Sequence, residues 1–200
     1  MKKIITLILS ISLILTLCFS LCACGQSASP VEDFEYEFTD GTVTITGYIG
    51  TDLEIVIPDT IEERPVTVIG EKAFSEYDMT SIILPNTLTL IEERAFDDCK
   101  QLEKIDIPDS VTEISYYAFC GCENLKEVNL GSELKTIEQD AFLSCNSLKS
   151  IKIPEYVTNM YDIGFGYSDG KYNDFTIYGK SGSDAERYSK EYDNITFIAE

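Results

Sequence analysis

Three cysteines at a constant interval are the first feature of this sequence that could support chemistry. Cys99, Cys122 and Cys145 are each 23 residues apart. Metal ligands must converge on one point, whereas side chains at a fixed interval in stacked coils lie in a line about 4.8 Å apart and point the same way. This spacing is compatible with the Cα–Cα distance of a disulfide, but side chains that point the same way are less compatible with the geometry of the bond. We therefore expect buried free thiols, with Cys120, which follows Phe119 in an expected turn, as a thiol that could be exposed.

Acidic side chains are abundant, with 35 Asp and Glu against 15 Lys and Arg and a formal net charge of −20. A glycosidase needs two carboxylates about 5 to 9 Å apart across a cleft. Adjacent acids on exposed turns face outward instead, so we expect solvated carboxylates of ordinary acidity at Glu62–Glu63, Glu92–Glu93 and Asp97–Asp98. The chain has no histidine, nucleophile elbow, phosphate loop or CxxC pair. The sequence thus predicts no catalytic residue and no cofactor.

A cluster of oxygen-bearing side chains near the C-terminal end could form a calcium loop. Asp162, Asp169, Asn173 and Asp174 are interleaved with glycines, and calcium prefers oxygen ligands. Their spacing fits no EF-hand, and the same residue types make ordinary turns. No metal ligand is therefore assigned, and dependence on calcium stays an open alternative.

The strong negative charge also restricts the partners of the chain. The basic residues are scattered along the sequence, whereas binding to nucleic acid or to an anionic membrane surface requires a basic patch. We therefore expect no nucleic-acid partner. In the simplest interpretation the charge provides solubility, and a specific basic partner is the alternative.

An apolar pattern recurs along the chain at the same interval as the cysteines. Its positions in one copy are Leu102, Ile105, Ile107, Val111, Ile114, Ala118 and Phe119, and further copies begin at Met79, Leu125 and Leu148. A period of 20 to 29 residues with this spacing is typical of leucine-rich repeats, in which each repeat forms one coil. Each I-x-I segment forms a short strand that pairs in parallel with the next copy. We predict a β-rich leucine-rich-repeat solenoid of stacked coils of about 23 residues with a parallel sheet.

The two ends of the solenoid have sequences of other types, as the ends of an open stack require. Residues 34–38 alternate apolar with acidic, Asp40-Gly41 is a hairpin turn signal, and residues 43–48 continue the alternation, which predicts an N-terminal β-hairpin cap. Residues 183–186 form a capping box and residues 195–198 a closing strand, which predicts a C-terminal helix and strand cap. The predicted boundaries are 34–171 for the N-terminal cap with the repeats and 172–200 for the C-terminal cap.

The first residues of the chain predict export. Lys2 and Lys3 precede an uncharged apolar run that extends from Ile4 to Leu21. The sequence LCACG at 21–25 resembles a bacterial lipobox, which implies a lipoprotein signal peptide over 1–23, lipid attachment to the sulfur of Cys24 and a linker over 24–33. The protein would then be tethered to the outer face of the bacterial membrane. An uncleaved membrane-spanning anchor is the alternative, because the run is nearly long enough to cross a bilayer.

Outward side chains of the predicted strands form the main candidate binding face. Alternation places them on one continuous surface, and solenoids commonly bind through such surfaces, although a solvated sheet without a partner would have the same mixed polarity. The predicted face consists of Glu54, Val56, Ser81, Ile83, Lys104, Asp106, Glu127, Asn129, Ser150, Lys152, Thr176 and Tyr178. A second candidate is an aromatic patch of Tyr161, Tyr167 and Tyr172 with Tyr178, since tyrosine is enriched in binding hot spots. Aromatic residues are also needed to cap the end of a solenoid.

Several recurring motifs resemble one known family. The I-x-I-P strand ends, the x-x-A-F turns, the cysteine before each x-x-L, and the opening and closing segments resemble BspA-type leucine-rich repeats over about residues 38–200. This resemblance implies a bacterial surface protein that binds other proteins or host surfaces. It also implies the absence of catalytic activity, since members of the family generally lack it. We therefore expect a monomeric, non-catalytic, surface-anchored adhesion or protein-binding module. The alternative is a structural or accessory envelope lipoprotein that supports a surface complex.

Overall fold

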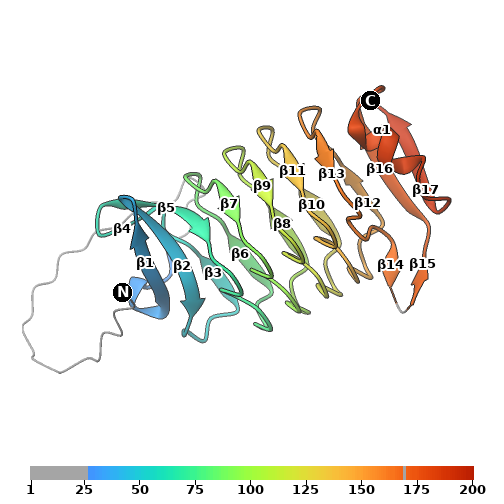
Figure 1. The fold of residues 1–200 in the computed structure, drawn as a ribbon. Coiled ribbons are helices and arrows are strands. Elements are labelled where there is room, and N and C mark those ends of the chain that lie inside the picture. Colours follow the sequence, from blue (N-terminus) through green and yellow to red (C-terminus); the bar gives the residue numbers. More distant parts are fainter. Residues whose placement is uncertain (1–26, 169) are drawn as a thin grey trace, which may run out of the picture.

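The computed structural model describes residues 27–168 and 170–200. The predicted signal peptide, Cys24 and Asp169 lie outside the described residues. The described chain coils into an elongated solenoid with strand β1 (Phe34–Thr39) at one end and helix α1 (Asp184–Ser189) at the other (Figure 1). Strands of successive coils pair side by side in parallel, which confirms the predicted fold class.

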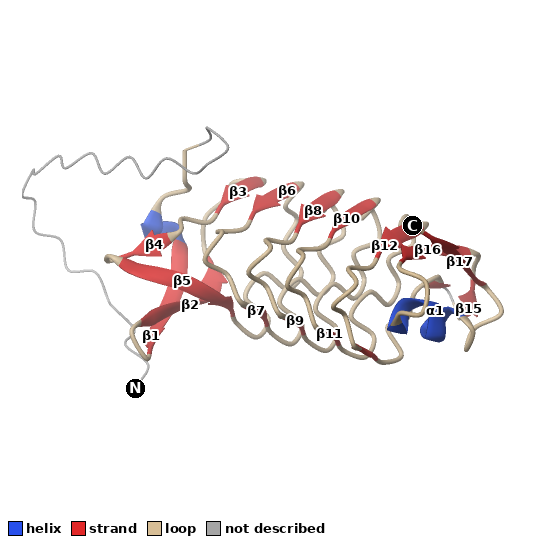
Figure 2. Ribbon diagram, turned by 90° about the horizontal axis from the view of Figure 1, so that it is seen from above, coloured by secondary structure: helices blue, strands red, loops and turns tan. Residues whose placement is uncertain are grey.

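One row of short strands lies along one side of the solenoid, and its outward surface is called the strand face below (Figure 2). Ile55 lies opposite Ile82, and Ile105 lies opposite Val128, so the central residue of each strand points into the core. Proline follows most of these strands and ends them, because it has no N–H for the ladder. The row consists of β3 (Glu54–Val56), β6 (Ser81–Ile83), β8 (Lys104–Asp106), β10 (Glu127–Asn129), β12 (Ser150–Lys152), β16 (Phe175–Gly179) and β17 (Ile195–Ala199).

A second row of parallel strands, which the sequence does not predict, lies on the opposite side of the coils (Figure 2). Ile91, Ile114 and Ile137 align along it and are fully buried. Most of these strands have two residues, too few to show an alternating pattern in the sequence. The row consists of β2 (Thr42–Tyr48), β5 (Arg64–Ile69), β7 (Leu90–Ile91), β9 (Glu113–Ile114), β11 (Thr136–Ile137) and β13 (Asn159–Met160).

A ladder of phenylalanines fills the core between the two rows. The rings of successive coils are stacked with centroids 5.1 to 5.6 Å apart, close to the spacing of paired strands. Each ring therefore packs on the equivalent ring of the coil before and the coil after. The ladder consists of Phe74, Phe96, Phe119, Phe142 and Phe165, and Phe175 continues it.

The N-terminal end of the solenoid is covered by the predicted hairpin. Strand β1 (Phe34–Thr39) pairs antiparallel with β2. Asp40 and Gly41 in the turn both have positive φ, 51° and 85°, as a type I′ turn requires. The longer first interval of the repeat contains another hairpin, formed by β4 (Thr60–Ile61) and β5, with the exposed acid pair 62–63 in its turn. The hairpin cap is confirmed.

The C-terminal end is covered by the predicted helix and closing strand. Strand β17 pairs in parallel with β16, and two more strands form a hairpin beside them. The predicted capping box forms differently, because the Ser183 hydroxyl makes no cap hydrogen bond and the Glu186 carboxylate accepts from the Gly182 N–H at 2.7 Å. The elements of this cap are β14 (Tyr167–Ser168), β15 (Lys171–Tyr172), β16, α1 (Asp184–Ser189) and β17.

Gly131 stands where other coils have the proline that ends a strand. A Cβ atom at this position would overlap the backbone carbonyl of Pro108 in the preceding coil. Gly131→Pro, although it restores the motif of the repeat, is therefore expected to lower the free energy of unfolding by about 1–3 kcal/mol, as overpacking does. Urea denaturation measures this change. Gly131→Ala should destabilise as well, whereas a gain in stability from proline would contradict the close approach.

Candidate functional site

Side chains in the middle of the strand face form one polar network across two coils. Lys104 lies opposite Glu127, and Asp106 lies opposite Asn129. The Lys104 ammonium is 2.9 Å from the Glu127 carboxylate, and the Asn129 amide donates to Asp106 at 2.7 Å and to Glu127 at 2.8 Å. The hydrogen bond between Lys104 and Glu127 raises the pKa of the lysine and lowers that of the glutamate. A general acid needs the opposite shift, so the shift of Glu127 does not favour acid catalysis, and the network orders charges of both signs on the surface.

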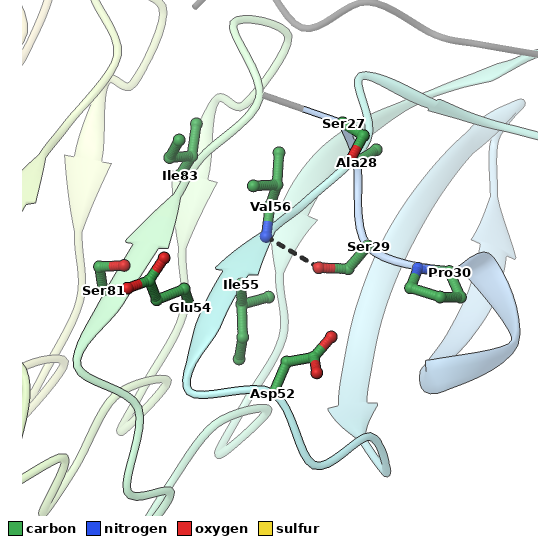
Figure 3. A pocket seen from close by; sticks show the side chains of 10 residues that line it. All are labelled: Ser27, Ala28, Ser29, Pro30, Asp52, Glu54, Ile55, Val56, Ser81 and Ile83. Atoms are coloured by element: carbon green, nitrogen blue, oxygen red, sulfur yellow. Dashed lines mark hydrogen bonds between the residues drawn. The ribbon is translucent and has the colours of Figure 1, made fainter. Parts of the chain in front are cut away.

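The N-terminal end of the strand face differs from the prediction at Val56. This side chain is only 6% exposed, because residues 27–30 run beside β3 (Figure 3). The Ser29 N–H donates to the Val56 carbonyl at 2.9 Å, and the Val56 N–H donates to the Ser29 hydroxyl at 3.0 Å. The placement of Val56 on the open face was therefore wrong. Residues 27–33, within the predicted linker, contact the first coil and include a 3-10 turn over Val31–Asp33.

A groove of about 270 Å³ lies between residues 27–30 and strands β3 and β6 (Figure 3). Its lining combines the carboxylates of Asp52 and Glu54 with the apolar side chains of Val56 and Ile83. Neither carboxylate forms an ion pair with any residue that the structure describes. Sequence reasoning missed this groove because one of its walls is a segment that carries no repeat motif.

The C-terminal end of the strand face is longer than predicted. The register of β17 adds Thr196 and Ile198 as outward residues, which the alternation of the closing strand could have identified. Across β12, β16 and β17 the face reads Ser150, Thr176 and Thr196 in one column and Lys152, Tyr178 and Ile198 in the other. The Lys152 ammonium lies 2.6 Å from the Glu200 carboxylate. This end therefore presents one neutralised ion pair beside apolar side chains.

The predicted aromatic patch is only partly assembled. The rings of Tyr167 and Tyr172 are 4.9 Å apart, and Tyr172 leads through Tyr192 to the buried Tyr188 in α1. This contact chain supports the cap. Tyr161 is 52% exposed and makes no ring contact within residues 27–168 and 170–200, and Tyr178 belongs to the strand face.

Two described members of the predicted oxygen cluster, Asp162 and Asn173, have other hydrogen-bond partners, and Asp169 lies outside the described residues. The Asp162 carboxylate accepts a hydrogen bond from the Tyr192 hydroxyl at 2.9 Å. The Asn173 N–H donates to the Gly166 carbonyl at 2.7 Å, as in an ordinary turn. In the described part of the chain, no group of three or more His, Cys, Asp or Glu side chains is placed to hold a metal ion.

The evenly spaced cysteines lie in the core as the sequence predicts. Each thiol donates to the carbonyl of the ladder phenylalanine in the preceding coil, so the thiols form a line parallel to the phenylalanine ladder. The pairs are Cys99 with Phe74 at 3.0 Å, Cys122 with Phe96 at 3.2 Å and Cys145 with Phe119 at 3.2 Å. Burial raises the pKa of Cys122 and of Cys145 above the ordinary value. All three thiols are buried, whereas reactive cysteines need access to solvent, so these thiols are structural.

Cys120 and Asp97 form a half-buried pair that the sequence does not predict. Burial, together with the charge of Asp97, raises the pKa of Cys120 to about 12. Burial also raises the pKa of Asp97, whose side chain is only 23% exposed. The expectation of an ordinary solvated carboxylate at Asp97 was therefore wrong, because the side chain turns toward the thiol.

Cys120 is expected to react slowly with alkylating reagents in the folded protein. With a pKa of about 12 against 9.0 for an ordinary thiol, its thiolate fraction at pH 8 is about a thousandfold lower. Asp97→Asn should accelerate labelling, because it removes a negative charge that disfavours the thiolate, but burial should keep the rate below that of the unfolded chain. Iodoacetamide labelling followed by mass spectrometry measures both rates. Glu93→Gln neutralises an exposed acid that is not among the charges acting on Cys120, and it should leave the rate unchanged. Fast labelling of the wild type would contradict the raised pKa.

Stacked coils, two rows of parallel strands and a continuous buried apolar ladder define a leucine-rich-repeat solenoid. The model of the BspA type leucine rich repeat region matches residues 54–180 in six copies. The chain belongs to this family, whose members are often surface-binding or adhesion proteins and typically non-catalytic. In the described residues, no helix is long and apolar enough to cross a bilayer.

Solved bacterial structures share this architecture. A leucine-rich repeat protein of T. pallidum is 30% identical with a TM-score of 0.71, over 76% of this chain and 71% of that one. One from Bacteroides ovatus is 38% identical with a TM-score of 0.60, over 66% and 37%. A leucine rich cell surface protein of Faecalibacterium prausnitzii is 26% identical with a TM-score of 0.62, over 79% and 46%. The chain thus spans less than half the length of the last two. No curated protein matches it.

Proposed function

We propose that this chain is a non-catalytic, surface-anchored binding module that recognises another protein or a host surface through its strand face. The main support for this proposal is that the outward side chains of seven adjacent strands form one surface across the coils. Solenoids commonly bind through such extended surfaces. The description of the Faecalibacterium prausnitzii relative as a cell surface protein supports the location.

The strand face offers different chemistry along its length. Asp52 and Glu54 lie beside the groove and form no ion pair with a described residue. The Lys104 network in the middle has charges of both signs, and Tyr178 and Ile198 give the far end an apolar character. A partner with complementary charge and an apolar region at matching positions would therefore be held in a single register. Such a pattern confers specificity more than raw affinity.

Lipid attachment at Cys24 would place this surface close to a membrane. The chain from Cys24 to Ser29 makes five Cα–Cα steps and spans at most about 17 Å when fully extended, and Ser29 is hydrogen-bonded to the first coil. The net charge of −20 opposes contact with an anionic leaflet. The first coil would therefore stay near the membrane, with the rest of the solenoid repelled from its surface.

The binding proposal is tested by a pull-down with residues 25–200 as bait. The prey are extracellular matrix proteins, mucin and an envelope extract of the producing cell. Lys104→Glu and Lys152→Glu should weaken capture of a host component, whereas Lys135→Glu makes the same charge change at an exposed site beside the second row and should not. Equal effects of all three variants would contradict binding through the strand face. Capture of envelope proteins alone would favour the accessory lipoprotein.

A further inference from the structure

The two rows of strands end in four edge strands. In three of them the free edge is either covered by another segment or carries charged side chains. The free edge of β3 is occupied by Ser29, and β13 lies beside α1. No described strand other than β2 pairs with β1, but Glu35 and Glu37 are exposed on it. Charges on an edge strand oppose pairing with another strand. The fourth edge strand, β17, is the last strand of the strand-face row (Figure 1).

The outer edge of β17 has unpaired backbone groups. Two hydrogen bonds of 2.9 Å fix its register, from the Phe175 N–H to the Asn194 carbonyl and from the Glu200 N–H to the Gly179 carbonyl. In a parallel pair this pattern turns the backbone groups of Thr196 and Ile198 toward β16. The N–H and C=O groups of Phe197 and Ala199 therefore point away from the sheet, and no described residue pairs with them.

We propose that β17 pairs antiparallel with β17 of a second copy of the chain, across a two-fold axis through Ile198. In this register Phe197 lies opposite Ala199 of the other copy, and the two residues exchange N–H···O=C hydrogen bonds. Ile198, which is 42% exposed, lies opposite Ile198 of the second copy. This is a non-hydrogen-bonded position, where cross-strand side chains come closest. Glu200 faces Thr196, so no two acids face each other.

The charge distribution favours contact between copies at this end. Residues 27–80 carry 13 acidic and 2 basic side chains, whereas residues 171–200 carry 6 and 4. The acid next to β17, Glu200, is neutralised by Lys152 at 2.6 Å. Repulsion between two copies is therefore smallest where the open edge lies. This arrangement replaces the monomer expected from the sequence with a two-fold dimer that joins two strand faces.

The dimer is expected to be weak, because a single pair of short strands buries less surface than a stable interface does. Sedimentation velocity of residues 27–200, which contain every core residue that the structure describes, should show a dimer whose fraction rises with protein concentration. A chain that stays monomeric up to millimolar concentration would overturn the proposal.

Ala199→Pro isolates the backbone contact, because it removes an outward N–H and leaves the ladder to β16 intact. This variant should be monomeric at concentrations where the wild type dimerises. Ala199→Val keeps the N–H and should still dimerise. Circular dichroism and thermal unfolding should show both variants folded, and a dimer that persists in folded Ala199→Pro would overturn the proposal.

A charge pair tests the two-fold register. Ile198→Lys and Ile198→Glu should each be monomeric, because like charges would face each other across the axis. Mixed in equal amounts they should form a heterodimer, detected by sedimentation, since Ile198 of one copy faces Ile198 of the other. Failure of the mixture to associate, or dimerisation of either variant alone, would overturn the proposed register.

Discussion

Ile105→Asp is expected to lower the free energy of unfolding by more than about 4 kcal/mol. The Ile105 side chain is 1% exposed at the centre of β8, where it lies opposite Val128 of β10. A carboxylate at this position would lose its water shell without gaining a partner, a mechanism behind the largest single-residue losses. Urea denaturation followed by circular dichroism measures the change.

The matched control is the adjacent residue, Lys104, whose side chain points outward from the same strand and is 49% exposed. Lys104→Met keeps the length of the side chain and should leave the urea midpoint close to that of the wild type. Equal losses from Ile105→Asp and Lys104→Met would show that β8 does not have the orientation described above.

The loss at Ile105 should spread, because each coil of a solenoid is held only by its neighbours. Strand β8 lies between β6 and β10. Hydrogen exchange of the variant should therefore show reduced protection in β6 and β10, while the hairpin cap at β1 and β2 keeps more of its protection. Uniform loss along the whole chain would indicate a more cooperative fold than nearest-neighbour packing provides.

The features of the fold that repeat were predictable from the sequence. Ile105, Val128 and Ile151 are inward residues of successive strands, because the same position is buried in every coil. Apolar residues therefore recur at this position every 23 residues. The hairpin cap was predictable for another reason, since Asp40-Gly41 is a local turn signal. Both inferences depend on patterns that are visible within one or two coils.

The features without a period were not predictable. Ser29 covers the edge of β3 through contacts with Val56, 27 residues away, and no motif marks that pairing. The Glu186 carboxylate accepts from the Gly182 N–H, one residue before the position that the capping-box pattern specifies. Cys120 and Asp97 belong to neighbouring coils and meet because of how their turns stack.

The candidate site, like the fold, was predictable in its repeating part and not at its two ends. Alternation correctly placed the side chains of Lys104, Asp106, Glu127 and Asn129 on one exposed surface, but it could not give their hydrogen-bond partners. The face was misjudged at its two ends, where Val56 is covered and Ile198 extends the surface. A repeat pattern describes a coil with neighbours on both sides, and the terminal coils lack one neighbour.

Phe119→Ala is expected to lower the free energy of unfolding by about 3–5 kcal/mol. The Phe119 ring is fully buried and stacked between Phe96, at 5.1 Å, and Phe142, at 5.3 Å. Truncation would leave a cavity that the flanking rings cannot fill, because each is held by its own coil. Urea denaturation of the variant measures the loss.

Two variants separate the stacking of Phe119 from its position in the chain. Phe38→Ala removes the same ring from the hairpin cap, where it is 41% exposed and lies 4.3 Å from the Arg64 guanidinium carbon. It should cost about 1 kcal/mol or less, since an exposed cation–π contact contributes little more. Phe119→Leu should lose less than Phe119→Ala, because it keeps most of the buried volume and gives up only the ring stacking. If Phe119→Ala cost no more than Phe38→Ala, the phenylalanine ladder would not be a principal source of stability, and the strands on either side of it would have to hold the coils together.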